Sequence, residues 1–206
     1  MARRPGVRLR LLGSHRTGPT KAERGAFSDG YDRPGRFGQN AGMTVAILMG
    51  SSSDASIMDD AVQTLRSFGV PVEIRVLSAH RTPDDTMAFA RGAAGSGVKV
   101  IIAAAGGAAH LAGVVAAATP LPVIGVPVAL ANLGGLDSLL AMVQMPKGIP
   151  VATVAVNGAR NAALLAVRIM ALSDPRLAAE LDRFTLDLAD QVRDMDAEIV
   201  AKYRVD

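Results

Sequence analysis

From residue 44 onward, short apolar runs alternate with segments in which apolar residues recur every three or four positions. Five segments have the length of a strand: residues 44–50, 71–77, 98–104, 121–126 and 151–156. The first is a continuous apolar run, which is typical of a strand that is buried on both faces. Because strands and helices alternate throughout with short connections, we predict a single doubly wound parallel α/β sheet, a three-layer flavodoxin-like or Rossmann-like architecture.

The last segment carries a different and longer helical pattern. Ser173-Asp174-Pro175 is a strong helix-start signal, and apolar residues then recur at steps of three and four as far as Ile199. The pattern predicts a helix within about residues 174–203, and roughly 25 helical residues at about 1.5 Å each span nearly 40 Å. Such a helix is longer than one small sheet can cover, so we expect it to pack on a neighbouring subunit of a homo-oligomer. Packing on its own domain remains the alternative.

The sequence pI of about 9.7 raises the question of a nucleic-acid partner. Residues 1–40, however, hold nine Lys or Arg and three acidic residues, a net charge of +6, and the rest of the chain carries −3. The longest apolar stretch, residues 98–118, contains Lys99 and His110, which argues against a membrane span. We therefore expect the α/β domain to bind neither nucleic acid nor a membrane.

Residues 1–42 differ in composition from the domain that begins at Met43. Residues 1–40 contain seven Gly and three Pro and no sustained apolar periodicity, which predicts a disordered basic extension. It is either an artefact of an upstream start, a natural extension, or an arm that touches RNA or a partner. The last is disfavoured because the arginines are scattered and aromatic residues are few. The apolar stretch at residues 7–12 is too short for a signal-peptide core.

The chain contains no cysteine. This excludes disulfides, thiolate metal sites and cysteine nucleophiles, and it fits a reducing cytoplasm better than a secreted setting. The sequence also shows no metal-ligand spacing, no Ser-His-Asp order and no carboxylate pair. We therefore expect a cytoplasmic protein whose site holds no metal and whose chemistry depends on histidine.

Three polar segments follow the first three predicted strands, at the points where loops lead into helices. In an open parallel sheet these loops lie at one edge, where ligands bind. The candidate residues are Ser51, Ser53 and Asp54 in the first loop, Ser78, Ala79, His80 and Arg81 in the second, and Gly106, Ala108 and His110 in the third.

The residue types in these loops suit an anionic ligand that contains a sugar. Hydroxyls and backbone N–H groups at a helix start can hold phosphate, whereas the carboxylate of Asp54 suits sugar hydroxyls. His80 can exchange a proton near neutral pH, and Arg81 can bind phosphate in bidentate fashion. Each segment alone has a plainer interpretation, such as helix capping by Ser53 and Asp54 or a solvated loop around His80. Together they predict one pocket with one or two histidines for proton transfer.

Six motifs carry a resemblance to a known family: Val45-Ala-Ile-Leu-Met-Gly-Ser-Ser-Ser-Asp54, Ser78-Ala-His-Arg-Thr-Pro83, Gly106-Gly-Ala-Ala-His-Leu111, Gly125-Val-Pro-Val128, Asp137-Ser-Leu139 and Val143-Gln-Met-Pro-Lys-Gly-Ile-Pro-Val151. Over residues 43–200 the chain resembles the N5-carboxyaminoimidazole ribonucleotide mutase family of purine biosynthesis, also known as the phosphoribosylaminoimidazole carboxylase catalytic subunit family. The motif around His80 resembles the bacterial class. Two positions depart from many members, Ala104 in place of Gly and Ala112 in place of Pro.

The resemblance implies an isomerase of IMP biosynthesis that moves a carboxylate from N5 of the substrate to ring carbon C4, without metal or organic cofactor. It implies loss of CO₂ and recarboxylation, with His80 as general acid and base, and a homo-octamer. The implied binding residues are Ser51, Asp54 and Arg81 for substrate, Ser53, Ser78 and Ala79 for phosphate or ribose, and Gly106, Ala108 and His110 for the base and CO₂. The alternatives are a carboxylase that uses free CO₂ and a non-catalytic nucleotide-binding module.

Overall fold

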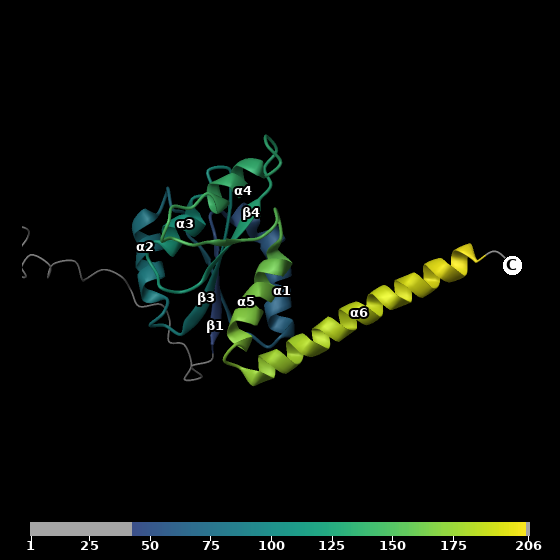
Figure 1. Cartoon of the computed structure of the whole chain (residues 1–206). Coiled ribbons are helices and arrows are strands. Elements are labelled where there is room, and N and C mark those ends of the chain that lie inside the picture. The colour runs from purple at the N-terminus through teal and green to yellow at the C-terminus, as the bar shows by residue number, and fades with distance from the viewer. Residues whose placement is uncertain (1–42, 205–206) are drawn as a thin grey trace, which may run out of the picture. The chain divides into compact units, whose positions relative to one another are not determined.

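The computed structural model describes residues 43–204. The predicted extension over residues 1–42 lies outside the described residues. Five strands form one parallel sheet in the order β2-β1-β3-β4-β5. Figure 1 labels three of them, β1, β3 and β4. The strands are β1 (Thr44–Met49), β2 (Val72–Val76), β3 (Val98–Gly106), β4 (Val123–Val128) and β5 (Ala152–Thr153). The predicted doubly wound α/β class is confirmed, and this strand order is the flavodoxin-like one.

A short 3-10 turn η1 (Ser52–Asp54) and six α-helices follow the strands. The helices are α1 (Ala55–Ser67), α2 (Pro83–Gly92), α3 (Leu111–Ala116), α4 (Leu136–Val143), α5 (Ala159–Ala171) and α6 (Pro175–Tyr203). The sequence did not predict α4, which has only eight residues and follows two glycines with positive φ, Gly134 and Gly135. Among residues 43–204, none of these helices combines the length and the apolar character needed to span a bilayer.

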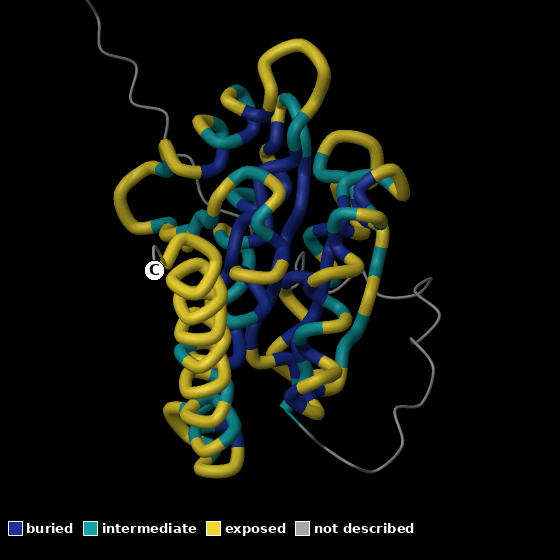
Figure 2. Tube along the Cα trace, turned by 90° about the vertical axis from the view of Figure 1, so that its right-hand side faces the viewer, coloured by how far each residue is buried: buried dark blue, intermediate teal, exposed yellow. Residues whose placement is uncertain are grey.

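Alternate residues of the strands build two apolar cores, one on each face of the sheet. Val45, Ile47 and Ile102 belong to the core under α1 and α5. Ala46 and Leu48, which point to the other face, belong to the core that includes residues of α2, α3 and α4. Both faces of the central strands are therefore buried, as the continuous apolar run of β1 predicted for that strand (Figure 2).

The fifth strand is shorter than the predicted residues 151–156. Only Ala152 and Thr153 pair with β4, although Val154 still donates its N–H to Gly125 O at 3.0 Å. Pro127 of β4 has no N–H to offer on this side, so the regular ladder stops there. The chain stays beside β4 through the N–H of Asn157, which donates to Pro127 O at 2.8 Å.

The long C-terminal helix is confirmed as α6, which has 29 residues. The side chain of Asp174 caps it by accepting the N–H groups of Arg176 and Leu177. Leu177 is fully buried, and the Phe184 ring meets Phe68 edge to face at 5.7 Å between centroids. The large apolar residues beyond this point are exposed: Leu186, Leu188, Val192, Met195, Ile199, Val200 and Tyr203 (Figure 2).

The start of α4 gives a first test of the packing. Gly134 and Gly135 both have positive φ, but a Cβ on Gly134 would meet nothing within 4 Å, whereas one on Gly135 would lie 2.6 Å from Val156 Cγ1. Both alanine variants bear a backbone strain of about 1–2 kcal/mol. Gly135→Ala adds overpacking of about 1–3 kcal/mol, so its free energy of unfolding in urea should be the lower of the two. Equal stabilities would contradict the close contact between Gly135 and Val156.

Candidate functional site

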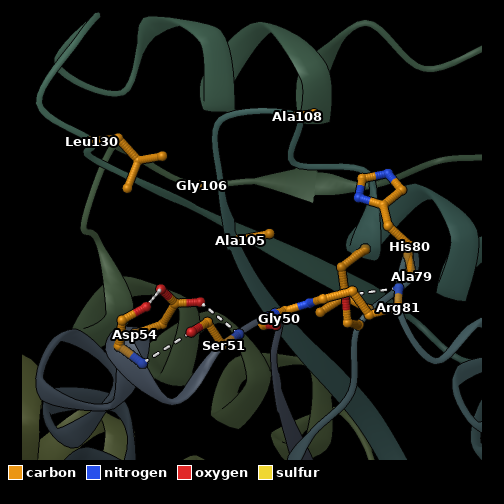
Figure 3. Close-up of a pocket in the computed structure, with 13 residues that line it drawn as sticks. Gly50, Ser51, Asp54, Ala79, His80, Arg81, Ala105, Gly106, Ala108 and Leu130 are labelled. Carbon is orange, nitrogen blue, oxygen red and sulfur yellow. Dashed lines mark hydrogen bonds between the residues drawn. The ribbon is translucent and has the colours of Figure 1, made fainter.

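The loops that leave β1, β2 and β3 at their carboxyl ends surround one cavity of about 300 Å³ (Figure 3). The lining residues are Gly50, Ser51, Ser53, Asp54, Ser78, Ala79, His80, Arg81, Ala105, Gly106, Ala108, Leu111 and Leu130. Nine of the ten residues that the sequence singled out are among them. The tenth, His110, does not line the cavity but contacts His80.

The first loop is a capping box at the start of η1. Ser51 Oγ accepts the N–H of Ser53 at 3.3 Å, and the N–H of Ser51 donates to Asp54 Oδ2 at 3.3 Å. The hydroxyl of Ser53 donates to the other carboxylate oxygen at 3.2 Å. Asp54 is only 5% exposed, so both of its oxygens are held in place by the loop itself. The capping role and a ligand-binding role are thus compatible in the same carboxylate.

The second loop is a turn that Arg81 joins to the first loop. The turn closes through the N–H of Thr82, which donates to Ser78 O at 2.8 Å. Arg81 Nε donates to Ser78 Oγ at 3.2 Å, and Arg81 Nη2 donates to Gly50 O at 2.5 Å. Figure 3 shows this side chain extended toward Gly50. The guanidinium is exposed and lies between two loops that carry hydroxyls, where an anion can reach it.

The third loop brings a second histidine to the first. Gly107 has φ +67°. The N–H groups of Ala109 and His110 each donate to the carbonyl two residues earlier, at 2.8 Å. His110 Nδ1 lies 2.9 Å from His80 Nε2, with the ring planes at 84°. A hydrogen bond between two imidazole nitrogens needs one donor and one acceptor, so the pair holds a proton between the rings.

Four lining residues are not among the ten candidates: Gly50, Ala105, Leu111 and Leu130. The first three belong to or adjoin the segments that the sequence singled out, whereas Leu130 lies in a loop that it did not. Leu130 follows β4, and its Cγ would lie 2.9 Å from a Cβ on Gly106, so this glycine leaves room for the leucine. The N–H of the preceding Ala129 donates to Asn157 Oδ1 at 2.9 Å, and Asn157 has φ +58°. Applying the strand-end argument to the fourth strand as well as the first three would have indicated this loop.

The described side chains around the cavity are not in an arrangement that binds a metal ion. Within residues 43–204 no group of three or more His, Asp or Glu side chains is arranged to hold a metal ion. The cavity instead collects hydroxyls and a carboxylate at a helix start, one guanidinium and the exposed ring of His80. These groups can bind an anion with hydroxyl groups and transfer a proton beside it.

The strand order and the position of the cavity define a flavodoxin-like α/β protein with its pocket at the carboxyl ends of the strands. Residues 44–191 match the family described as AIR carboxylase, and the chain belongs to this family. The family membership expected from the sequence motifs is thereby confirmed.

Relatives and a solved structure agree with this assignment. The chain is 60% identical over 155 residues to the N5-carboxyaminoimidazole ribonucleotide mutase of Mycobacterium leprae. The matched residues cover 75% of this chain and 91% of the relative. The chain is 58% identical over 140 residues to the phosphoribosylaminoimidazole carboxylase of Schizosaccharomyces pombe. Here the matched residues cover 68% of this chain and 25% of the relative. The crystal structure of Treponema denticola PurE superimposes with a TM-score of 0.70 at 31% identity, covering 75% of this chain and 97% of that one.

Asp54 offers a test of the first loop. In Asp54→Asn the amide oxygen can still accept the N–H of Ser51, but the amide N–H₂ must donate to the Ser53 hydroxyl instead of accepting from it, and both bonds lose the charge of the carboxylate. We expect the free energy of unfolding in urea to fall by about 1 kcal/mol. Asp59→Asn, an exposed carboxylate on α1, is the control and should change stability by less than about 0.5 kcal/mol. Equal effects of the two substitutions would show that the capping box contributes nothing.

Proposed function

We propose that this protein is an N5-carboxyaminoimidazole ribonucleotide mutase. It converts 5-(carboxyamino)imidazole ribonucleotide to 4-carboxy-5-aminoimidazole ribonucleotide in purine biosynthesis. The proposal is supported by the names of close relatives in the family. The observation that carries it is the His80–His110 pair, 2.9 Å apart at a cavity whose other two loops supply hydroxyls and a guanidinium.

The binding roles follow from the chemistry of each loop. Ser51, Ser53, Ser78, Ala79 and Arg81 contribute hydroxyl, backbone and guanidinium donors for the phosphate and ribose. The fixed carboxylate of Asp54 accepts hydrogen bonds from the ribose hydroxyls. Gly106 and Ala108 border the base and the CO₂, because these small residues leave the backbone open to a flat ring. His110 acts on the same part of the pocket through its contact with His80.

The histidine acts twice in the proposed reaction. His80 donates a proton to N5 as the bond between N5 and the carboxylate breaks and CO₂ is released inside the pocket. The ring carbon C4 then attacks CO₂, and the neutral His80 accepts the proton that C4 loses. One proton leaves His80 and one returns, so the isomerisation needs no oxidant, no reductant and no external base.

Two other functions are distinguished by one assay. Purified protein is given the N5-carboxylated ribonucleotide, and turnover is followed by ultraviolet absorbance. Turnover without added bicarbonate supports the mutase. Turnover of aminoimidazole ribonucleotide that depends on bicarbonate, with no use of the N5-carboxylated substrate, would identify a carboxylase instead. Binding without turnover of either compound would identify a nucleotide-binding module.

His80→Asn tests the catalytic role directly. The amide keeps a similar size but cannot carry the proton, so kcat should fall by at least about 100-fold. Ribonucleotide binding, measured by calorimetry, should change by less than about threefold because the donors in the other loops remain. His15→Asn, which changes a histidine outside the family match, is the control and should leave kcat unchanged. A fully active His80→Asn enzyme would exclude the role given to this residue.

We also propose a homo-octamer in the cytoplasm, in which α6 packs on a neighbouring subunit. Two exposed apolar surfaces support the assembly. One is the stripe on α6 beyond Phe184, and the other is formed by Leu136, Leu140 and Val143, which recur at steps of four and three on α4. Val192 alone is 63% exposed, and contiguous apolar surface of this kind marks an interaction site. The absence of cysteine and the nucleotide substrate agree with a cytoplasmic enzyme.

Charged residues on the α6 stripe should separate the subunits. In Val192→Asp with Met195→Asp, two carboxylates would be desolvated at the interface, so the mass measured by light scattering should fall below that of the octamer. Asp187→Asn with Asp194→Asn, two polar positions one heptad apart on the same helix, is the control and should leave the mass unchanged. If the Val192→Asp, Met195→Asp double variant is still an octamer, α6 does not belong to the interface. If the wild-type protein itself is a monomer, the proposed octamer is wrong.

A further inference from the structure

One residue of the motif Asp137-Ser-Leu139 lies behind the site without lining the cavity. Ser138 is in the first turn of α4 and is fully buried, with 0% of its surface exposed. Buried hydroxyls are normally hydrogen-bonded, so its partners show what it holds. Neither the cavity lining nor the mechanism above assigns it a role.

The hydroxyl of Ser138 bridges two different segments. It donates its proton to Val128 O at 2.7 Å, at the end of β4. With its lone pairs it accepts the N–H of Gly107 at 2.9 Å, at the start of the third loop. A hydroxyl has only one proton, so giving it to Val128 leaves the oxygen as the acceptor for Gly107. The side chain therefore ties the third loop to β4 and α4.

The segment from Gly107 to His110 is otherwise bonded mainly to itself and to the helix that follows. Its N–H groups at Ala109 and His110 donate within the loop, and His110 O accepts from Val114 in α3. Among the described residues, only two hydrogen bonds join residues 107–110 to segments outside the loop and α3. One is the bond from Gly107 to Ser138, and the other is the ring contact between His110 and His80.

We propose that Ser138 is a positioning residue that holds the third loop so that His110 stays in contact with His80. The expected effect on kcat rests on the proposed function, whereas the expected effect on the positions of the two histidine rings does not. The ring nitrogens are 2.9 Å apart, and a displacement of roughly 0.5 Å would carry them beyond a good hydrogen bond. Loss of the hydroxyl would leave the N–H of Gly107 without its partner, and the loop would shift to satisfy it.

Ser138→Ala removes the bridge, and Ser138→Thr restores a hydroxyl at the same place. We expect kcat of Ser138→Ala to fall by about 10- to 100-fold, with KM changed by less than about threefold, because substrate donors in the other loops are untouched. Ser138→Thr should recover at least a third of the wild-type kcat. Ser138→Cys, which keeps the volume but donates weakly, should lie between the two and serves if the alanine variant does not fold.

Val167→Ala is the control for lost stability alone. Val167 is fully buried in α5, in the core on the α1 side of the sheet, and does not line the cavity. Its truncation should lower the urea midpoint while leaving kcat within about twofold of wild type, because it removes no contact of the site. If Ser138→Ala has wild-type kcat, or loses no more than Val167→Ala does, the proposal is wrong.

A structural measurement separates this proposal from the mutase activity. The chain has three histidines, so in His15→Asn protein the nitrogen-15 NMR signals of the histidine rings belong to His80 and His110. Ser138→Ala should shift both sets of ring signals, whereas Ser138→Thr and Val167→Ala should leave them near their wild-type positions. Unchanged ring signals in Ser138→Ala would overturn the proposal. If the wild type proves to have no mutase activity, this measurement still decides the role of Ser138.

Discussion

The parallel pairing of β1 with β2 on one side and β3 on the other is the constraint on which the site depends. The pairing aligns Met49 with Val76 and with Ala104, so β1 and β2 end at one level and β3 ends two residues further on, at Gly106. A slip of one residue would move a loop by about 3.3 Å and exchange the two faces of the strand. Contacts such as the 2.9 Å separation of His80 and His110 would then be lost.

The polar groups of the loops are largely satisfied before any ligand arrives. The capping box holds the carboxylate of Asp54, and Arg81 is tied to Ser78 and Gly50. Fixed donors and acceptors bind with a smaller loss of conformational entropy than mobile ones. The two bonds of Arg81 use Nε and one hydrogen of Nη2, so the N–H groups of Nη1 can bind a phosphate while the bond to the carbonyl of Gly50 persists. The second loop is therefore both a part of the scaffold and a part of the candidate binding surface.

The sequence predicted the elements whose local signals agree with their surroundings. The apolar runs of β1 and β3 are buried on both faces, and Asp174 and Pro175 start α6 where expected. The sequence did not predict α4, because eight residues after two glycines give too short an apolar pattern. It also did not predict the early end of β5, because this depends on Pro127 in the neighbouring strand. The strand-end argument could have indicated the loop after β4, but the contact of Leu130 with Gly106 results from the tertiary fold, which no local pattern records.

The contact between Gly106 and Leu130 also bears on how such a chain can evolve. A side chain at position 106 would meet Leu130 Cγ at 2.9 Å, so residue 106 can grow only if the half-exposed side chain of Leu130 moves or is shortened. A smaller residue at 130 would make the exchange tolerable, but it would also remove an apolar wall of the cavity. The two positions are therefore epistatic: the order in which they mutate decides whether an intermediate sequence keeps its pocket.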